Sequence, residues 1–572
     1  MQIIKSFIKL LVFICPISTM AQSTYLNQGA KEYHFMERLE IKQQTNTDLN
    51  FSTLKPFNRK HIVREAEFLD SARMGYRDSM GIDKYKTWTD LDLTAVDEYN
   101  LRSLLMNNSE WVTVPKEDFL SKKPLLKSLY KTKANLLEVN NKDFFLVVNP
   151  ILNIQQAVEP GYDQGIFLNT RGISVRGLIA KKVGFASWFT DNQERGPRFF
   201  QEQVANSRAV PGVGFYKNFK NTGVDYFDAR GYFTFNAAKF IDFQMGYDKN
   251  FIGNGYRSLF LSDWGNSNLF VKINTKVWKL NYQNLFMELM PQFYKRGDSL
   301  LDRKYAAMHH LSMNVTKWLN IGLFEGIVFG RKNRFDFQYL NPIIFLRHIE
   351  GQNGSPDNAL AGLDFKANVA HKLQFYGQFM LDEFVLSAVK ANTGDWKNKY
   401  AIQLGVKYID AFGIKNLDLQ FESNRVRPYT YSHYDTVANY SHYNQPLAHP
   451  LGANFQEYIG IVHYQPAPRW TINAKAIYYQ QGVDSAGLNF GSNIFKNYTS
   501  RVGDLGNFVG NGAKATCFNG NLNISYELKE NLFLDASLQS RLYKIDGFTG
   551  NSNTTIVTAG IRLNMFKRNY DF

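Results

Sequence analysis

Residues Asn521–Tyr543 read NLNISYELKENLFLDASLQSRLY and consist of two segments in which apolar and polar residues alternate. In the first segment Leu522 and Ile524 lie on one face of an extended chain, and Asn521 and Asn523 lie on the other. The second segment repeats this pattern after the three residues KEN. A period of two residues is typical of β-strands that are apolar on one face only. The stretch therefore predicts an antiparallel hairpin with a short turn.

The same alternation recurs along residues 143–572, and the joints between the segments are of two lengths. Short joints lie near Lys181, Ala238–Lys239, Thr275–Lys276, Thr316–Lys317, His371, Gly413, Pro466 and Lys529. Long polar joints cover about 191–224, 251–267, 291–303, 330–358, 386–398, 428–454, 483–515 and 546–553. A sheet with short turns at one edge and long loops at the other is characteristic of outer-membrane barrels.

One opening strand at about 143–156, eight hairpins and one closing strand give eighteen strands. A tilted membrane-spanning strand requires roughly 9–11 residues, which these segments provide. A large soluble β-protein would have a solvated second face, whereas here that face is apolar and aromatic. Lipid accounts for such a face, and closure of the sheet leaves no backbone edge in hydrocarbon. We therefore expect an all-β transmembrane barrel of about 18 antiparallel strands over 143–572, with its closing strand leading to Phe572.

The composition agrees with an exported membrane protein. Aromatic residues make up 15% of the 572 residues, and the formal net charge is +15. Residues 1–21, MQIIKSFIKLLVFICPISTMA, combine an early lysine, a short apolar run and Ala21, which predicts a cleaved signal peptide. No later segment has 18 uninterrupted apolar residues, so no helical membrane span is expected. Without Cys15, the remaining Cys517 has no partner for an intrachain disulfide.

Residues 22–142 lack this alternation and predict a small α-helical periplasmic segment followed by a connector. Helical spacing of apolar residues occurs over Lys31–Gln43, Asn58–Arg73 and Leu93–Asn107. Asn58 suits the N-cap of the second helix, and Thr94 with Asp97 resembles a capping box at the third. The run ANLLEV at residues 134–139 is compatible with one additional strand.

Two blocks, Gly246–Ser267 (GYDKNFIGNGYRSLFLSDWGNS) and Tyr339–Phe365 (YLNPIIFLRHIEGQNGSPDNALAGLDF), resemble the Wzi-like capsule-assembly barrels, in particular their RemB-type gliding-motility branch. Val426–Tyr458 and the opening helices are similar to the same family. The resemblance implies an 18-stranded outer-membrane barrel with a periplasmic helical part. It further implies a protein that binds capsular polysaccharide or serves surface motility, and not an enzyme.

Polar and aromatic side chains gather in these blocks and in the long joint at 428–454. Rings stack on the apolar faces of sugars, and charged groups bind sugar hydroxyls, so this mixture suits a carbohydrate. The carbohydrate-binding residues predicted on this basis are Arg257, Asp263, Arg347, Glu350, Arg425, Arg427, Tyr431, His433 and His442. The alternative is that the joint folds over the barrel mouth and its tyrosines pack on one another.

Other kinds of site have less support. His433, His442 and His449 are spaced by nine and seven residues on a loop, a weak pattern for zinc, so neither a metal nor a cofactor is expected. The glycines Gly253 and Gly255 lie between strands and not before a helix, which disfavours a phosphate loop. The chain has no GxSxG and no HExxH motif, and its lysines are scattered. We therefore expect neither catalysis nor nucleic-acid binding.

The sequence favours an outer-membrane barrel that binds or organises capsular or exopolysaccharide, with a role in gliding motility. Its expected partners are membrane lipid and surface polysaccharide. Two alternatives stay open. An 18-stranded barrel is wide enough to be a channel for small solutes, and the helical segment could bind motility or secretion proteins as an accessory part of their apparatus.

Overall fold

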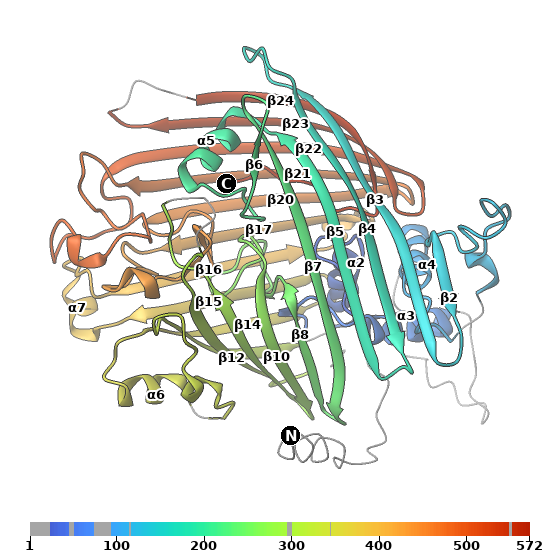
Figure 1. Ribbon diagram of the computed structural model, residues 1–572, viewed down its shortest axis with the longest axis horizontal. Coiled ribbons are helices and arrows are strands. Elements are labelled where there is room, and N and C mark those ends of the chain that lie inside the picture. Colours follow the sequence, from blue (N-terminus) through green and yellow to red (C-terminus); the bar gives the residue numbers. More distant parts are fainter. Residues whose placement is uncertain are drawn as a thin grey trace.

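The computed structural model describes residues 23–44, 51–73, 93–113, 116–294, 300–343, 345–547 and 552–572. Its framework is a closed barrel of 18 antiparallel strands (Figure 1). The barrel strands are β3 (Phe144–Val158), β4 (Ile166–Ile179), β5 (Val183–Arg195), β7 (Gly223–Ala238), β8 (Ile241–Asp248), β10 (Asn268–Val277), β11 (Leu280–Leu289), β12 (Lys304–Asn314), β13 (Leu319–Phe329), β14 (Asn358–Val369), β15 (Leu373–Glu383), β16 (Lys399–Tyr408), β17 (Leu417–Val426), β20 (Phe455–Ala467), β21 (Trp470–Val483), β22 (Ala513–Lys529), β23 (Leu532–Ile545) and β24 (Ser552–Leu563).

Each barrel strand pairs with the barrel strands before and after it, and β24 closes the ring on β3, from Val557 opposite Val158 to Leu563 opposite Leu152. The predicted strand count and the two classes of joint are confirmed. The tight turn expected at Thr275–Lys276 lies slightly later, between Val277 and Leu280. Long loops at one end and short turns at the other orient the barrel, with the loops external and the turns periplasmic.

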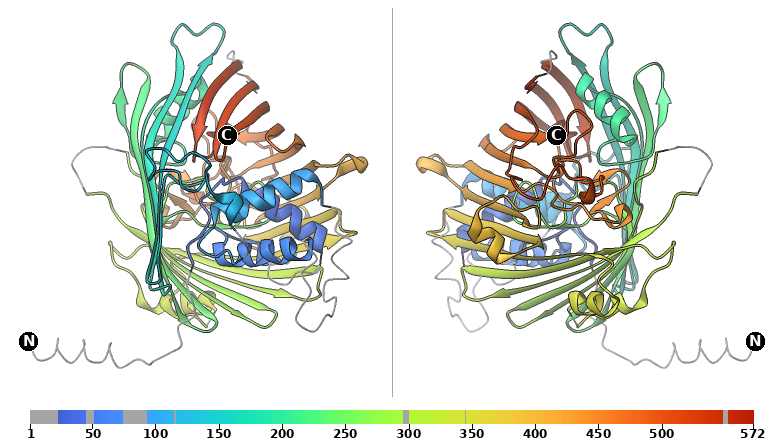
Figure 2. Two further views of the ribbon diagram at one scale, coloured as in Figure 1. Left: turned by 90° about the vertical axis from the view of Figure 1, so that its right-hand side faces the viewer. Right: turned by 90° about the vertical axis from the view of Figure 1, so that its left-hand side faces the viewer.

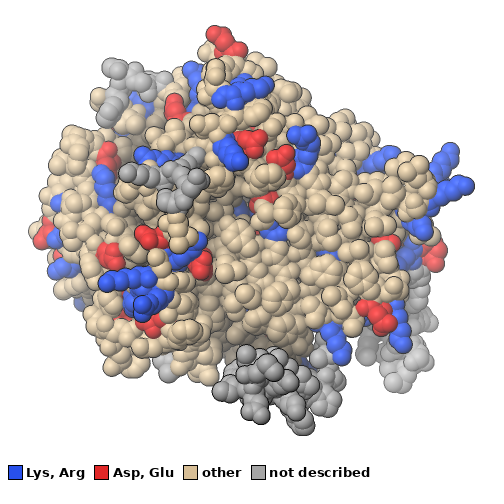
Figure 3. All heavy atoms as spheres, viewed as in Figure 1, with Lys and Arg blue, Asp and Glu red and all other residues tan. Residues whose placement is uncertain are grey.

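The two faces of the barrel wall follow the alternation in the sequence. Leu522 and Ile524 are 42% and 38% exposed on the outside, whereas Asn523 between them is 2% exposed and faces inward. Figure 3 shows few charged side chains over β5, β7 and β8, while Lys, Arg, Asp and Glu gather toward the ends of the molecule. An apolar outer wall and a polar inner wall are what a barrel in lipid requires.

Three helices, α2 (Glu32–Gln43), α3 (Arg59–Arg73) and α4 (Ala95–Asn107), lie across the end of the barrel that carries the short turns (Figure 2). Their predicted positions and caps are confirmed. Thr94 and Asp97 form a capping box at α4, and the side chain of Asn58 accepts hydrogen bonds from the Lys60 and His61 amides at α3. Within the described part of the chain, no helix is both long and apolar enough to cross a membrane.

The additional strand considered at 134–139 exists as β2 (Leu137–Asn140) and does not change the strand count. It pairs with the first half of β3, and β24 pairs with the second half along the same edge. The predicted signal peptide at residues 1–21 lies outside the described residues. The boundary at residue 142 between the helical segment and the barrel stays a prediction.

Two external loops, residues 249–267 and 427–454, turn into the bore and pack together, and we call them the loop plug. The Tyr431 and Tyr440 hydroxyls donate to the carbonyl oxygens of Leu259 (2.8 Å) and Phe260 (2.6 Å), and the two tyrosine rings stack at 5.5 Å. Short strands β9 (Phe251–Ile252) and β18 (Ser441–His442) lie in these loops; β18 pairs with β19 (Gln445–Pro446), and β9 with β1 (Leu54–Lys55) near the helices. The external half of the bore is therefore filled by protein.

The end of the chain also enters the bore, which differs from the expected closing strand. β24 ends at Leu563, and residues 564–572 turn inward, so Phe572 is not part of the wall. Arg568 and Tyr570 of this tail bind the carboxylate of Glu194 at 3.1 Å and 2.6 Å. Asp571 accepts hydrogen bonds from Tyr256 and Lys475. The polar inner wall thus holds a segment of its own chain, which the alternation alone could not reveal.

A filled bore predicts little ion conduction. Purified protein in a planar lipid bilayer is expected to show no large steady current, because the loop plug, the tail and the helices occupy the route through the barrel. Replacing residues 430–452 by a short Gly-Ser linker should raise the conductance, whereas the same replacement of residues 386–394 should not. Large steady currents through the unmodified protein would contradict this description and favour the channel alternative.

Candidate functional site

Between the helices and the loop plug the bore contains a cavity of about 650 Å³. Its lining combines charged groups and rings from the helical segment, the plug, the wall and the tail, among them His34, Arg230, Lys249, Tyr256, Asp263 and Arg568. Burial lowers the pKa of Lys249 to about 7, and nearby Arg230 acts in the same direction. The cavity is thus a chamber within the bore whose lining carries groups of both charges beside apolar surface.

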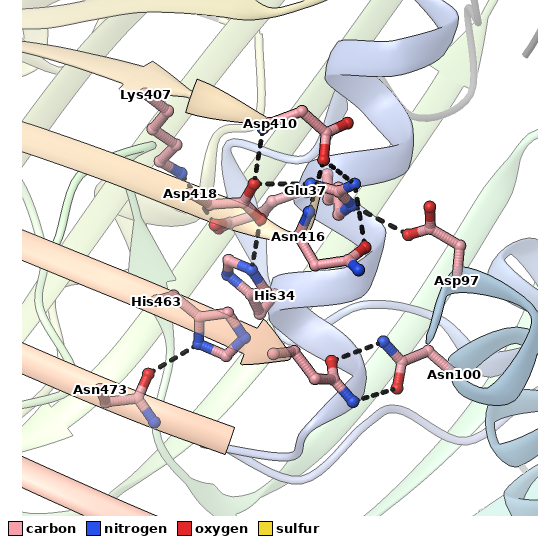
Figure 4. Close-up of polar contacts among 12 residues, drawn as sticks. His34, Glu37, Asp97, Asn100, Lys407, Asp410, Asn416, Asp418, His463 and Asn473 are labelled. Atoms are coloured by element: carbon pink, nitrogen blue, oxygen red, sulfur yellow. Dashed lines mark hydrogen bonds and ion pairs between the residues drawn. The ribbon is translucent and has the colours of Figure 1, made fainter. Parts of the chain in front are cut away.

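Arg38 on α2 links the helices to the wall beside this chamber. Its guanidinium donates to Asp97 of α4 at 2.9 Å, to Asp410 at 2.6 Å and to Asp418 of β17 at 2.5 Å. Figure 4 shows the three carboxylates converging beside α2, with Asn416 between them. Since Arg38 is nearly fully buried, the loss of this shared cation would leave three carboxylates poorly compensated.

Two histidines continue the contact along α2. His34 lies 2.9 Å from the Asp418 carboxylate, and its ring stacks on that of His463 with centroids 3.7 Å apart. His463 in turn bonds to Asn473 at 2.6 Å (Figure 4). The helical segment is therefore fixed to the periplasmic end of the wall by a continuous polar network.

The nine residues predicted to bind carbohydrate do not come together in one site. Arg257 is buried and donates to the Asp571 backbone oxygen at 2.5 Å, and the Asp263 carboxylate accepts from Gln28 at 2.6 Å at the edge of the chamber. Arg347 and Glu350 pair with each other at 2.5 Å on α6 (Leu346–Gln352), which lies outside the wall. Arg257 and Asp263 both line the chamber, whereas Arg347 and Glu350 lie apart from it on α6, so the four residues occupy two separate places.

Arg425 and Arg427 are also separated from each other. Arg425 lies on the outer face of β17, alternating with buried Asn424 and Val426. Arg427 bridges two other external loops, because its guanidinium donates to the carbonyl oxygens of Asn398 (2.6 Å) and Asn507 (3.0 Å). Arg427 thus connects loops, and its role in binding carbohydrate stays a prediction.

Tyr431, His433 and His442 are buried in the loop plug. Burial lowers the pKa of His442 to about 4, so its neutral ring accepts a hydrogen bond from the Met290 amide (3.0 Å) and donates to the Ser267 carbonyl oxygen (3.1 Å). His449 pairs instead with Glu457 at 2.7 Å. Among the described residues there is no group of three or more His, Cys, Asp or Glu side chains arranged to hold a metal. These histidines order the plug.

A group of rings lies on the external side of the plug, and we call Trp396, His433, Tyr434 and Tyr498 the aromatic cluster. Tyr498 is 4.9 Å from Trp396, 6.5 Å from Tyr434 and 6.0 Å from His433, measured between ring centroids. The residues come from three loops, 384–398, 427–454 and 484–512. Tyr434 is 44% exposed, so part of the cluster is accessible to solvent.

Cationic groups lie against the same rings. The Arg501 guanidinium is 4.1 Å from the centroid of Trp396, and the Lys399 ammonium is 4.5 Å from that of Tyr498. Arg501 also pairs with Asp504 at 2.6 Å, and Lys399 with Asp382 at 3.0 Å. Lys399 is fully buried beneath the rings, whereas Arg501 and Asp504 are partly and largely exposed. The cluster therefore combines rings with accessible hydrogen-bonding groups, the combination that suits a sugar.

Sequence reasoning placed only His433 of this cluster among the candidate residues. Trp396, Tyr498 and Arg501 lie in the predicted long joints 386–398 and 483–515, so their exposure to the external side was foreseeable. Their convergence was not, because it depends on contacts such as that of the Asn497 side chain with the Tyr434 carbonyl oxygen (2.6 Å).

The chain matches the family model described as "Capsule assembly protein Wzi" over residues 229–551, more than half of its length. Among solved structures it is similar to Escherichia coli Wzi, described as an outer membrane protein involved in group 1 capsule assembly and a carbohydrate-binding β-barrel. The TM-score is 0.56 and the identity 13%, over 95% of this chain and 100% of that one. No curated protein sequence matches the chain.

Two further solved structures match with lower scores. Pseudomonas aeruginosa OprD gives a TM-score of 0.41 at 12% identity, over 73% of this chain and 95% of that one. Acinetobacter baumannii OccAB4 gives a TM-score of 0.40 at 9% identity, over 74% of this chain and 98% of that one.

Arg38→Met should weaken the attachment of α2 to the wall by up to about 3–5 kcal/mol, because Asp97 and Asp410 then keep only Lys42 as a cation and Asp418 keeps only the His34 ring. The expected readout is faster proteolysis of the helical segment while the barrel stays intact. Arg102→Met is the control, since its partner Asp118 is half exposed and a pair of that kind contributes about 0–1 kcal/mol. Equal protease resistance of the two variants would contradict the assigned role of Arg38.

The same network predicts a pH dependence. Burial alone would raise the pKa of Asp97, but Arg38 and Lys42 outweigh it and hold this pKa below its ordinary value. A depressed folded-state pKa gives stabilisation that is complete above the ordinary value of about 3.9 and is lost as the pH falls below it. Protease protection of α4 should therefore stay constant from about pH 8 to about pH 5 and decline below about pH 4.

Proposed function

Because the chain belongs to the family of the capsule assembly protein Wzi and forms an outer-membrane barrel, we propose that it binds a surface polysaccharide at its external face and helps to organise it there. The observation that carries this proposal is the aromatic cluster with its adjoining cations. Escherichia coli Wzi, which has a similar fold, is described as carbohydrate-binding. The proposed role is binding without catalysis.

The loop plug supports the proposal by giving the cluster a rigid base. The Tyr429 hydroxyl donates to the Asn489 carbonyl oxygen at 2.8 Å, which joins loop 427–454 to loop 484–512. Arg427 joins both to loop 384–398. Rings that are held in place before a ligand arrives lose little conformational entropy on binding. Several contacts inside the plug thus contribute to binding indirectly.

A filled bore disfavours the alternative of a channel for small solutes. Roles in gliding motility, or in binding motility or secretion proteins through the helical segment, stay predictions, since none of the described contacts bears on them.

The ring faces can be tested with a double variant, Trp396→Ala/Tyr498→Ala. Loss of two stacking surfaces should cost about 2 kcal/mol, which is roughly thirtyfold in Kd. The measurement is calorimetric titration of detergent-solubilised protein with capsular polysaccharide extracted from the bacterium that carries this chain.

Two variants serve as controls. Phe412→Ala removes an exposed ring in the periplasmic turn between β16 and β17, and Arg425→Ala removes a charge from the outer wall. Both should bind like the unmodified protein. Unchanged binding by the Trp396→Ala/Tyr498→Ala variant would exclude the cluster as the binding surface.

A further inference from the structure

The long loop between β13 and β14 folds back over the outside of the barrel, and we call residues 331–343 and 345–357 the strap. It contains a 3-10 helix, η3 (Phe337–Leu340), and α6, which lies to the side of β12 and β14 in Figure 1. Tyr339, Leu346 and Ile349 of the strap form one buried cluster with wall residues, which are Phe286, Tyr305, Ala307, Ile327 and Phe329. The strap is therefore packed against the wall and not free in solvent.

Alternation along the strands shows which face of the wall the strap covers. Leu285 and Met287 of β11 belong to the interior cluster around Phe260 of the plug, so Phe286 between them points outward. Leu323 of β13 points to the same side of the wall as Ile327 and Phe329, because it lies an even number of residues from each. It lies beyond the strap and is 52% exposed. The strap thus covers the external half of a face whose periplasmic half faces lipid.

Polar contacts fix the depth to which the strap reaches. Asn284, His309 and Glu325 are register partners across β11, β12 and β13, near the middle of these strands. Asn284 donates to the Pro342 carbonyl oxygen at 3.2 Å, and the Glu325 carboxylate accepts from the Leu346 amide at 3.0 Å. Strands of about 9–11 residues span the hydrocarbon layer, so the middle of the strap lies well below the membrane surface.

The strap also covers polar side chains whose exposure to lipid would be energetically costly. His309 is nearly fully buried and lies 2.8 Å from Glu325 on the outward face. An uncovered polar pair at that depth would be costly in hydrocarbon. The strap covers this pair in part by its Leu346 amide, which donates to the Glu325 carboxylate.

The outer side of the strap is apolar around η3 and the residues that follow it, while the exposed side chains of Arg347 and His348 lie farther along on α6. Phe337, Ile343 and Phe345 are 77%, 85% and 73% exposed. At the membrane rim the strap is pinned by polar contacts, because Arg331 donates to the Asp357 carboxylate at 2.7 Å and 2.6 Å, and the Tyr339 hydroxyl donates to it at 2.6 Å. Adjacent exposed apolar side chains of this size mark a surface that contacts a partner or a membrane.

We propose that the strap is inserted into the outer leaflet of the membrane and that acyl chains of outer-leaflet lipid cover its exposed apolar side. The continuity of this side with the lipid-facing wall carries the assignment of lipid as the occupant. Asn284 and Glu325 are positioning residues that hold the strap at this depth. This inference is independent of carbohydrate binding at the external face.

Spin-label accessibility tests the insertion directly. A label at Ile343→Cys, in a Cys517→Ser background and reconstituted into lipid bilayers, should be accessible to oxygen and protected from a water-soluble nickel complex. A label at Leu505→Cys, in the external loop 484–512, is the aqueous control and should be accessible to nickel. A second label at Phe345→Cys gives an independent reading if the first variant folds poorly. Nickel accessibility at both strap positions equal to that at position 505 would overturn the proposal.

Two further measurements test whether Asn284 and Glu325 position the strap and whether lipid or a second copy of the chain covers it. Adding Asn284→Ala and Glu325→Ala should release the strap, seen as a gain of nickel accessibility at position 343, and no gain would overturn the positioning role. Dipolar coupling between labels at position 343 on different molecules would show that a second copy, and not lipid, covers this side. Absence of that coupling together with nickel protection supports lipid as the occupant.

Discussion

Hydrocarbon offers no hydrogen-bond partner to a peptide group, so each backbone N–H and C=O inside a membrane must be paired within the protein. This chain meets that constraint by closing β24 onto β3, which leaves no free edge among the barrel strands. The remaining features follow from closure. The outer wall must be apolar, the inner wall is left for polar groups, and a ring of 18 strands encloses more space than wall side chains alone can fill.

The chain fills this space with its own loops, tail and helices, and the inner polar groups hold them in place. Arg38 joins two helices to the wall through three carboxylates, and Glu194 holds the tail through Arg568 and Tyr570. Buried charges of this kind are satisfied only when every partner is present. Polar residues that resemble ligand-binding groups in the sequence therefore serve mainly to fix the interior.

The side chains that are accessible at the external face are those that this internal pairing does not use. Tyr431 and His442 are used within the plug, whereas Trp396, Tyr434 and Tyr498 are brought together at its outer side. A similar division explains the external halves of strands β11 and β12, where both faces are buried. The plug covers their inner face and the strap covers their outer face, so strict alternation is lost there although both are membrane-spanning strands.

The sequence by itself determined the barrel, its strand number, its orientation and the three helices with their caps, because alternation, turn length and capping are local properties that each stretch expresses alone. It did not determine that residues 564–572 enter the bore, that Arg427 bridges loops, or that the strap lies on the outer wall. Those outcomes depend on partners that are distant in the sequence, such as Asn507, which is 80 residues from Arg427, and Glu194, which is 374 residues from Arg568. Only closure of the ring brings such groups within bonding distance, so only the tertiary structure decided the site.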